Sequence, residues 1–131
     1  MPHFIIEYSA NLEQQISVDD VISRVHAAAA ETGIFPLKGT RTRAARREAY
    51  QIADGHPDNL FVHLQARIGA GRSLDVKQQA AQHIFEALTA VLEPVSARAP
   101  LAISFEVVEM DEALNFKHNN IPEWLEKRKS G

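Results

Sequence analysis

The sequence has 131 residues, 45% of them hydrophobic and 24% charged, with a formal net charge of −3 at pH 7. This length and composition fit one folded domain with its own core and exclude a disordered chain. The absence of cysteine excludes disulfides, thiolate metal sites and cysteine nucleophiles. No apolar run approaches the roughly 18–20 residues of a membrane-spanning helix, and no long basic run points to nucleic acid as the main partner. We therefore expect a soluble, cytoplasmic protein.

The first half of the sequence has the pattern of a strand, a helix and a second strand. Residues 3–8 alternate apolar side chains as a half-buried strand does. Valine, isoleucine and alanine then recur at helical spacing over residues 18–29, directly after Ser17, a favoured N-cap residue. The Thr-Arg alternation that follows predicts a strand to about residue 44, whereas residues 45–53 stay unassigned because their composition also suits a helix.

After a clear turn at residues 54–58 the same pattern begins again. Strict alternation over residues 60–68 predicts a third strand. Ser73 is a candidate N-cap for a second helix, and we expect that helix to end at Pro94. Alternation over residues 101–107 predicts a fourth strand.

Two similar halves, at about residues 2–54 and 59–110, and a tail at 111–131 predict one domain of the α+β class. Each βαβ half implies a parallel strand pair with a right-handed crossover. Together they predict one four-stranded mixed sheet with two helices on one face. The tail contains a short helix candidate near residues 122–125. Because the strands are apolar on more than one side, we expect another subunit to cover the open face.

Pro2 is the first candidate for chemistry. A small second residue favours removal of Met1, which would leave a secondary amine at the head of the first strand. An N-terminal amine titrates near pH 7.7–8.0 when unperturbed, closer to neutrality than lysine at about 10.4, so a modest downward shift makes it a base at pH 7. The alternative is a strand-initial proline, a position where the missing N–H costs little.

Two groups of arginines are candidates for binding an anion. Arg72 lies in a Gly-Ala-Gly-Arg-Ser stretch where a strand passes into a helix, and the free N–H groups of a helix start favour an anion. Arg41 and Arg43 alternate along a predicted strand, followed by Arg46 and Arg47. A polyanionic ligand would explain these arginines. A tight turn and a solvated charged stretch are the alternatives.

Other familiar sites are missing. The six histidines lack the close spacing of a metal site, and no elbow motif suggests a Ser-His-Asp set. We expect no metal and no cofactor.

Four stretches together resemble the 5-carboxymethyl-2-hydroxymuconate isomerase family of the tautomerase superfamily. They are residues 2–7 (Pro-His-Phe-Ile-Ile-Glu), 32–37 (Thr-Gly-Ile-Phe-Pro-Leu), 68–74 (Ile-Gly-Ala-Gly-Arg-Ser-Leu) and 101–120 with its Leu-Asn-Phe-Lys segment. The resemblance covers nearly the whole chain to about residue 120. It implies a single tautomerase-like domain and a homotrimer whose sheets enclose a barrel with the helices outside.

The resemblance also implies roles for individual residues. Pro2 would be the catalytic base, Arg41 and Arg72 would bind substrate carboxylates, and Arg43 is a candidate for a further carboxylate. Phe116 matches the family's apolar residue beside the proline. The implied reaction converts a 2-hydroxymuconate dienol to its conjugated keto isomer without metal or cofactor, in the breakdown of 4-hydroxyphenylacetate.

The related 4-oxalocrotonate tautomerase resembles one half of this chain, and the comparison implies that the two halves divide the site between them. The first half keeps the proline and Arg41 but has Leu12 near the helix-start arginine. The second half keeps Arg72 but has Val62 and Ser104 at the other two positions.

Two other functions remain open at this point. The first is a binding protein with the same fold that has lost catalysis or shifted its substrate. Retained Met1 would favour it, since an acylated proline nitrogen is not a base. The second is a ferredoxin-like RNA binder, which shares the order of elements. Its expected sheet-face aromatics and basic balance are missing.

Overall fold

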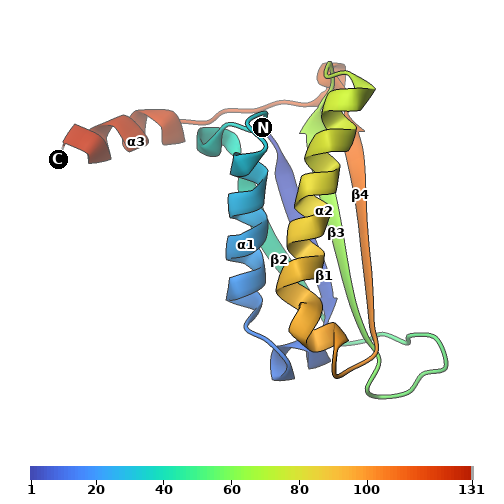
Figure 1. Cartoon of the computed structure of the whole chain (residues 1–131). Helices are drawn as coiled ribbons and strands as arrows, with labels where there is room; N and C mark the ends of the chain where they lie inside the picture. The colour runs from blue at the N-terminus through green and yellow to red at the C-terminus, as the bar shows by residue number, and fades with distance from the viewer. Residues whose placement is uncertain (131) are drawn as a thin grey trace.

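The first half of the chain forms two parallel strands joined by a helix (Figure 1). The computed structural model describes residues 1–130. The elements of this half are strand β1 (His3–Ser9), the 3₁₀ helix η1 (Ala10–Gln14), helix α1 (Val18–Glu31), the 3₁₀ helix η2 (Leu37–Gly39) and strand β2 (Arg41–Arg47). Strands β1 and β2 pair in register from His3 opposite Arg41 to Ser9 opposite Arg47.

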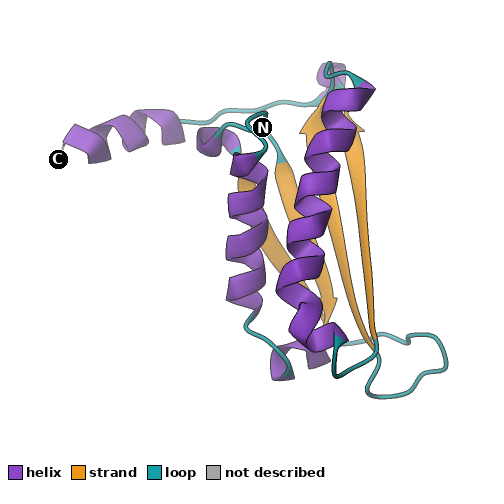
Figure 2. Ribbon diagram, viewed as in Figure 1, coloured by secondary structure: helices purple, strands orange, loops and turns teal. Residues whose placement is uncertain are grey.

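The second half repeats this arrangement with longer elements. Strand β3 (Leu60–Gly69), helix α2 (Leu74–Ser96) and strand β4 (Leu101–Met110) are followed by the 3₁₀ helix η3 (Glu112–Leu114) and helix α3 (Ile121–Ser130). β3 pairs in parallel with β4 and antiparallel with β1, so the sheet order is β2-β1-β3-β4. Figure 2 shows α1 and α2 together on one face of this sheet. The predicted α+β class and mixed sheet are confirmed.

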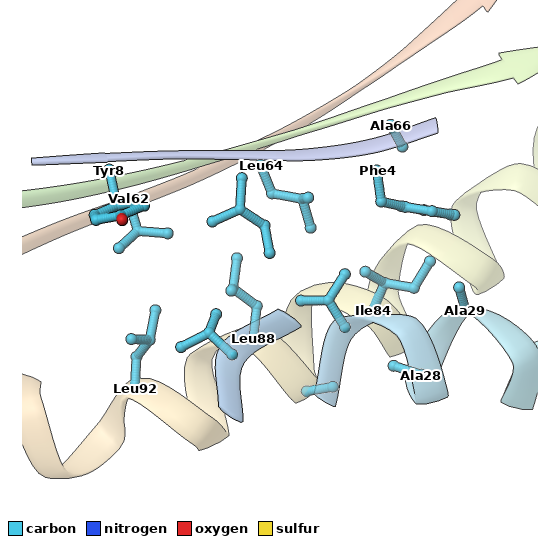
Figure 3. Close-up of a cluster of buried hydrophobic side chains, with 14 of the residues drawn as sticks. Phe4, Tyr8, Ala28, Ala29, Val62, Leu64, Ala66, Ile84, Leu88 and Leu92 are labelled. Atoms are coloured by element: carbon cyan, nitrogen blue, oxygen red, sulfur yellow. The ribbon is translucent and has the colours of Figure 1, made fainter. Parts of the chain in front are cut away.

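The core lies between the helices and the two central strands (Figure 3). Every second side chain of β1 and β3 points into it, which is the alternation that the sequence shows. The fully buried side chains include Phe4, Ile6, Val62, Leu64 and Ile68 from the sheet and Val21, Val25, Ile84, Leu88 and Leu92 from the helices. Each such side chain contributes roughly 1.5–3 kcal/mol when buried.

The structure defines the end of β2, which the sequence left open, and moves the predicted end of α2. β2 continues past residue 44 to Arg47, because each of its residues pairs with β1 and Arg47 Nε lies 2.6 Å from Glu7 Oε2. α2 continues through Pro94 to Ser96. Pro94 lies in the last turn, where the Ala97 N–H still donates to Glu93 O at 2.9 Å and the neighbouring Val95 is fully buried.

Both α1 and α2 begin where the sequence predicts, but only α2 has a side-chain N-cap. Ser73 caps α2, since its Oγ accepts from the Val76 N–H at 3.3 Å. Ser17 precedes α1 but makes no side-chain capping bond. In residues 1–130 no helix is both long and apolar enough to cross a membrane.

The open face of the sheet differs from the apolar surface that we expected. Polar side chains there pair with one another: His63 Nδ1 lies 2.6 Å from Ser104 Oγ, and Gln65 Nε2 donates to Glu106 Oε1 at 3.0 Å. Ile5 and Phe61 are its apolar members on the central strands, and both are half-buried. The alternation that fills the core necessarily leaves the other residues of each strand on this face.

The C-terminal segment crosses the end of the sheet, passes the N-terminus and carries α3 away from the body (Figure 1). Its helix includes the predicted residues 122–125 and extends to Ser130. Trp124 is half exposed, with Lys127 Nζ 4.3 Å from its ring centroid.

Candidate active site

Pro2 lies buried at the start of β1, where the sheet meets the crossing C-terminal segment. Its carbonyl oxygen accepts a hydrogen bond from the Arg41 N–H at 3.1 Å, which continues the pairing of β1 with β2. It lines a hollow of about 450 Å³. The other lining residues are Met1, Phe35, Pro36, Gly69, Ala70, Arg72, Met110, Glu112, Asn115 and Lys117.

The Arg72 side chain is held in this hollow by backbone oxygens. Its Nη1 donates to Gly69 O at 3.3 Å and its Nη2 to Ile34 O at 2.9 Å. The guanidinium carbon also lies 5.1 Å from the Phe35 ring centroid, within the range of a cation–π contact. A guanidinium has five N–H donors, so three remain for a ligand. Arg72 is therefore a cation held in a fixed orientation in this hollow.

The backbone around Arg72 explains its position. β3 ends at Gly69, and α2 begins directly after Ser73. Gly71 has a φ of +112°, a conformation that side chains with a Cβ rarely adopt. This turn lets the chain pass from strand to helix in four residues. The arginine consequently points back across the end of β3 to the loop after α1, where it reaches Ile34 O.

Phe35 forms the apolar wall of the hollow. Its ring is buried and packs edge-on against Phe4, with centroids 5.5 Å apart. Since Phe4 is a core residue of β1, the wall is continuous with the core beneath Pro2.

Arg41 lines a second hollow, of about 280 Å³, on the other side of Met1. Its Nη2 donates to Met1 O at 3.5 Å, and its buried Nε has no hydrogen-bond partner within residues 1–130. Because Met1 lines both hollows, it lies between Arg41 on one side and Pro2 and Arg72 on the other. Met1 also packs tightly on Gly39, where an added Cβ would lie 3.4 Å from Met1 Cγ.

The cations around the N-terminus affect its protonation. Burial, followed by the charges of Lys117, Arg41 and Arg72, lowers the pKa of the Met1 α-amine. Burial and the neighbouring arginines, Arg41 before Arg43, likewise lower the pKa of His3. His3 Nδ1 lies 3.1 Å from Arg43 Nη1. Because a guanidinium can only donate, His3 accepts this bond through Nδ1 in its neutral form.

The five predicted site residues do not all lie together. Pro2 and Arg72 share one hollow, and Arg41 lies across Met1 from them. Arg43 is exposed, contacts His3 and lines neither hollow. Phe116 is 88% exposed and lines neither, although its neighbours Asn115 and Lys117 line the first. Adjacent side chains of an extended segment point in opposite directions, and within one chain Phe35 takes the position expected of Phe116.

Sequence reasoning assigned no role to Phe35 or to Lys117. Both lie in stretches that carry the family resemblance, which is the one signal that could have found them. An aromatic residue after a helix is usually a core residue, and a lysine in a polar tail is usually solvated. Their shared position becomes visible only when the C-terminal segment is seen to cross the end of the sheet (Figure 1).

The other hollows are less suited to chemistry. A hollow of about 920 Å³ lies between α2 and β4 and is lined by glutamine, alanine, serine and phenylalanine side chains with no charged group. In residues 1–130 no three His, Asp or Glu side chains gather closely enough to hold a metal ion.

The fold places the protein in a known structural class. It is similar to a macrophage migration inhibitory factor-like protein from Entamoeba histolytica, with a TM-score of 0.60 at 14% identity, covering 90% of this chain and 96% of that one. The four-stranded mixed sheet with its two helices thus defines a tautomerase-type fold.

Closer relatives show the family. The family model described as 5-carboxymethyl-2-hydroxymuconate isomerase matches residues 2–125. A 5-carboxymethyl-2-hydroxymuconate Delta-isomerase of Escherichia coli is 41% identical over 121 residues, which cover 92% of this chain and 96% of the relative. The crystal structure of a 5-carboxymethyl-2-hydroxymuconate isomerase from Deinococcus radiodurans R1 has a TM-score of 0.86 at 36% identity, covering 95% of this chain and 93% of that one. The chain belongs to the 5-carboxymethyl-2-hydroxymuconate isomerase family.

Proposed function

We propose that this protein is a 5-carboxymethyl-2-hydroxymuconate Delta-isomerase that uses the amine of Pro2 as its base after Met1 is removed. Family membership supports the activity. The observation that supports the mechanism is the position of Pro2: it shares a hollow with Arg72, and Met1 lies between this hollow and the one that Arg41 lines. The reaction belongs to the breakdown of 4-hydroxyphenylacetate.

Loss of Met1 would change the site in three ways. It would expose the nitrogen of Pro2, which is now part of a peptide bond. It would join the two hollows that Met1 lines. It would also remove the carbonyl oxygen that Arg41 Nη2 now contacts, and so free donors of Arg41 for a ligand. One cavity would then contain the amine and both arginines.

The surroundings favour an unprotonated amine. The burial and cationic charges that lower the pKa of the Met1 α-amine lie one residue from the Pro2 nitrogen. Each disfavours an ammonium there for the same physical reason. A base whose pKa lies near the working pH can both take up and return a proton efficiently.

The proton transfers follow from this arrangement. Pro2 nitrogen takes the proton of the 2-hydroxyl group, and negative charge develops on that oxygen and along the diene. Arg41 and Arg72 stabilise the dienolate and hold substrate carboxylates. The protonated Pro2 then delivers its proton to the far end of the diene. The product has a keto group conjugated with the remaining double bond, and no atom is gained or lost.

We also propose that the protein acts as a homotrimer, as the family resemblance implies. The polar open face and the free edges of β2 and β4 are the surfaces available for contact between copies. Sedimentation equilibrium is expected to give three chains per particle, and a stable monomer would contradict this.

One experiment tests the function directly. The purified native protein is assayed by absorbance against a panel of 2-hydroxydienoates, and its intact mass is measured in parallel. We expect turnover of 5-carboxymethyl-2-hydroxymuconate and a mass without Met1. If Met1 is retained and no dienol is converted, the protein is a binding protein on this fold, because the Pro2 nitrogen remains acylated.

A further inference from the structure

Lys117 lies in the hollow of Pro2 and Arg72 without a partner of its own. It belongs to the segment between η3 and α3 that passes the N-terminus (Figure 1). Within residues 1–130 it makes no hydrogen bond and no ion pair, whereas Lys129 pairs with Glu126 at 3.3 Å. Its charge is the largest cationic influence on the pKa of the nearby α-amine. Lys117 is therefore close to the reacting group and free to bind an anion.

The segment around Lys117 is fixed on both sides. Before it, the Asp111 side chain accepts from the Ala113 N–H at 2.9 Å and caps η3. After it, Asn119 Nδ2 donates to Lys38 O at 3.1 Å, and Asn119 Oδ1 accepts from the Ile121 N–H at 3.0 Å. These bonds keep the backbone of Lys117 at the hollow and leave its long side chain free to move.

The proposed substrate has one more carboxylate than the arginines account for. This step rests on the proposed function. A 5-carboxymethyl-2-hydroxymuconate has a carboxylate at each end of its diene and a third on the carboxymethyl arm. The end carboxylates are held in line with the rigid diene, whereas the arm turns about a saturated carbon. Three anions of two different kinds therefore need to be bound.

We propose that Lys117 binds the carboxylate of the carboxymethyl arm and thereby sets the preference for a tricarboxylate over a dicarboxylate. Arg72, fixed by two backbone oxygens, presents a rigid fork suited to a carboxylate of fixed orientation. A lysine ammonium is a point charge on a flexible stem and can follow a mobile arm. Glu112 lines the same hollow and would repel a third carboxylate. Lys117 offsets that repulsion.

The test compares two substrates in two matched variants. Lys117→Met removes the charge and keeps an unbranched side chain. Lys127→Met removes the same charge on α3, where the ammonium lies over Trp124 and lines none of the hollows described above. KM and kcat are measured for 5-carboxymethyl-2-hydroxymuconate and for 2-hydroxymuconate, which lacks the arm. Lys117→Arg tests whether charge alone restores the preference.

We expect Lys117→Met to raise KM for the tricarboxylate about tenfold, as loss of one charge-assisted bond implies, and for the dicarboxylate by less than about twofold. Lys127→Met is expected to leave KM for both substrates unchanged. Lys117→Arg is expected to keep most of the preference for the tricarboxylate over the dicarboxylate. Equal increases for both substrates would show a general electrostatic effect and overturn the proposal. Unchanged KM values for both substrates in Lys117→Met would also overturn the proposal.

A binding measurement separates this proposal from the catalytic one. Titration calorimetry with adipate and with 2-carboxymethyladipate, saturated analogues that cannot isomerise, compares the binding of a dicarboxylate and a tricarboxylate without turnover. If the protein converts neither dienol, the proposed function fails. The Lys117 proposal then stands if Lys117→Met weakens only the tricarboxylate analogue, and falls if it does not.

Discussion

The Arg72 Nη2 group donates to the carbonyl oxygen of Ile34 at 2.9 Å, although the two residues lie in different halves of the chain. Arg72 lies in the turn before the helix of the second βαβ unit, and Ile34 follows the helix of the first. This bond makes the orientation of the Arg72 guanidinium in one half depend on a loop of the other half. Residues from both halves of the chain therefore form the hollow beside Pro2.

Replacement of Pro2 tests the proposed base. In Pro2→Ala, the N-terminus after methionine removal becomes a flexible primary amine, so we expect kcat/KM to fall about 100-fold, within the usual contribution of acid–base catalysis. Initial rates with 5-carboxymethyl-2-hydroxymuconate measure the change, and intact mass verifies that Met1 is absent. Pro57→Ala, in an exposed turn, is the matched control. Activity of Pro2→Ala within twofold of wild type would exclude the amine base.

The pH dependence of turnover should reveal a lowered amine pKa. A base must be unprotonated, so kcat/KM rises with pH through the pKa of the free enzyme's amine. Burial and nearby cations lower the pKa of the α-amine in the structure from its usual value of 8.0. We therefore expect the acidic limb to have its midpoint below the pKa of the same proline amine in an unfolded chain. Lys117→Met removes one cation and should move that midpoint to higher pH; a shift to lower pH would contradict this electrostatic account.

Loss of the Arg72 fork should weaken transition-state binding. In the proposed mechanism Arg72 stabilises the developing dienolate, so we expect Arg72→Ala to lower kcat/KM about 100-fold. Arg72→Lys should recover little of this, because an ammonium cannot reach both Gly69 O and Ile34 O and still present a fork. Arg24→Ala, on α1 and paired with Glu31, serves as control. Wild-type KM and kcat in Arg72→Ala would remove Arg72 from the site.

Two phenylalanines should differ sharply in their effect on stability. Phe35 is 5% exposed and packs on Phe4, so Phe35→Ala should lower the free energy of unfolding by about 3–5 kcal/mol. Phe116 is 88% exposed, and Phe116→Ala should change it by less than about 0.5 kcal/mol in a dissociated chain. Urea unfolding at several protein concentrations measures both. A large, concentration-dependent loss in Phe116→Ala would show that another copy covers this side chain.

The sequence predicts the fold well because its signals are local. Alternation in β1 and β3 and helical spacing in α1 and α2 depend only on residues close together in the chain. The end of α2 was predicted at Pro94, whereas the helix continues to Ser96 and buries the Val95 side chain in the core. The extent of β2 was open because its pairing with β1, including Arg47 with Glu7, is a long-range property.

The positions of candidate site residues could be predicted where they lie at the ends of strands and helices. Pro2 heads β1, and Arg72 precedes α2, so their neighbourhood follows from the topology. Arg41 and Arg43 share one face of β2, but two residues of strand span about 7 Å, and only Arg41 reaches the end where Met1 lies. Phe116 and Lys117 depend on the path of the tail, for which the sequence has no periodic signal.

The position of Met1 between the two hollows has a practical consequence. An affinity tag fused ahead of it would keep the Pro2 nitrogen in a peptide bond and leave the two arginines apart, in a chain whose core is unaffected. Such a preparation would be well folded and inactive as a proline-dependent isomerase. A tag following α3, which points away from the body (Figure 1), leaves the amino end free for processing.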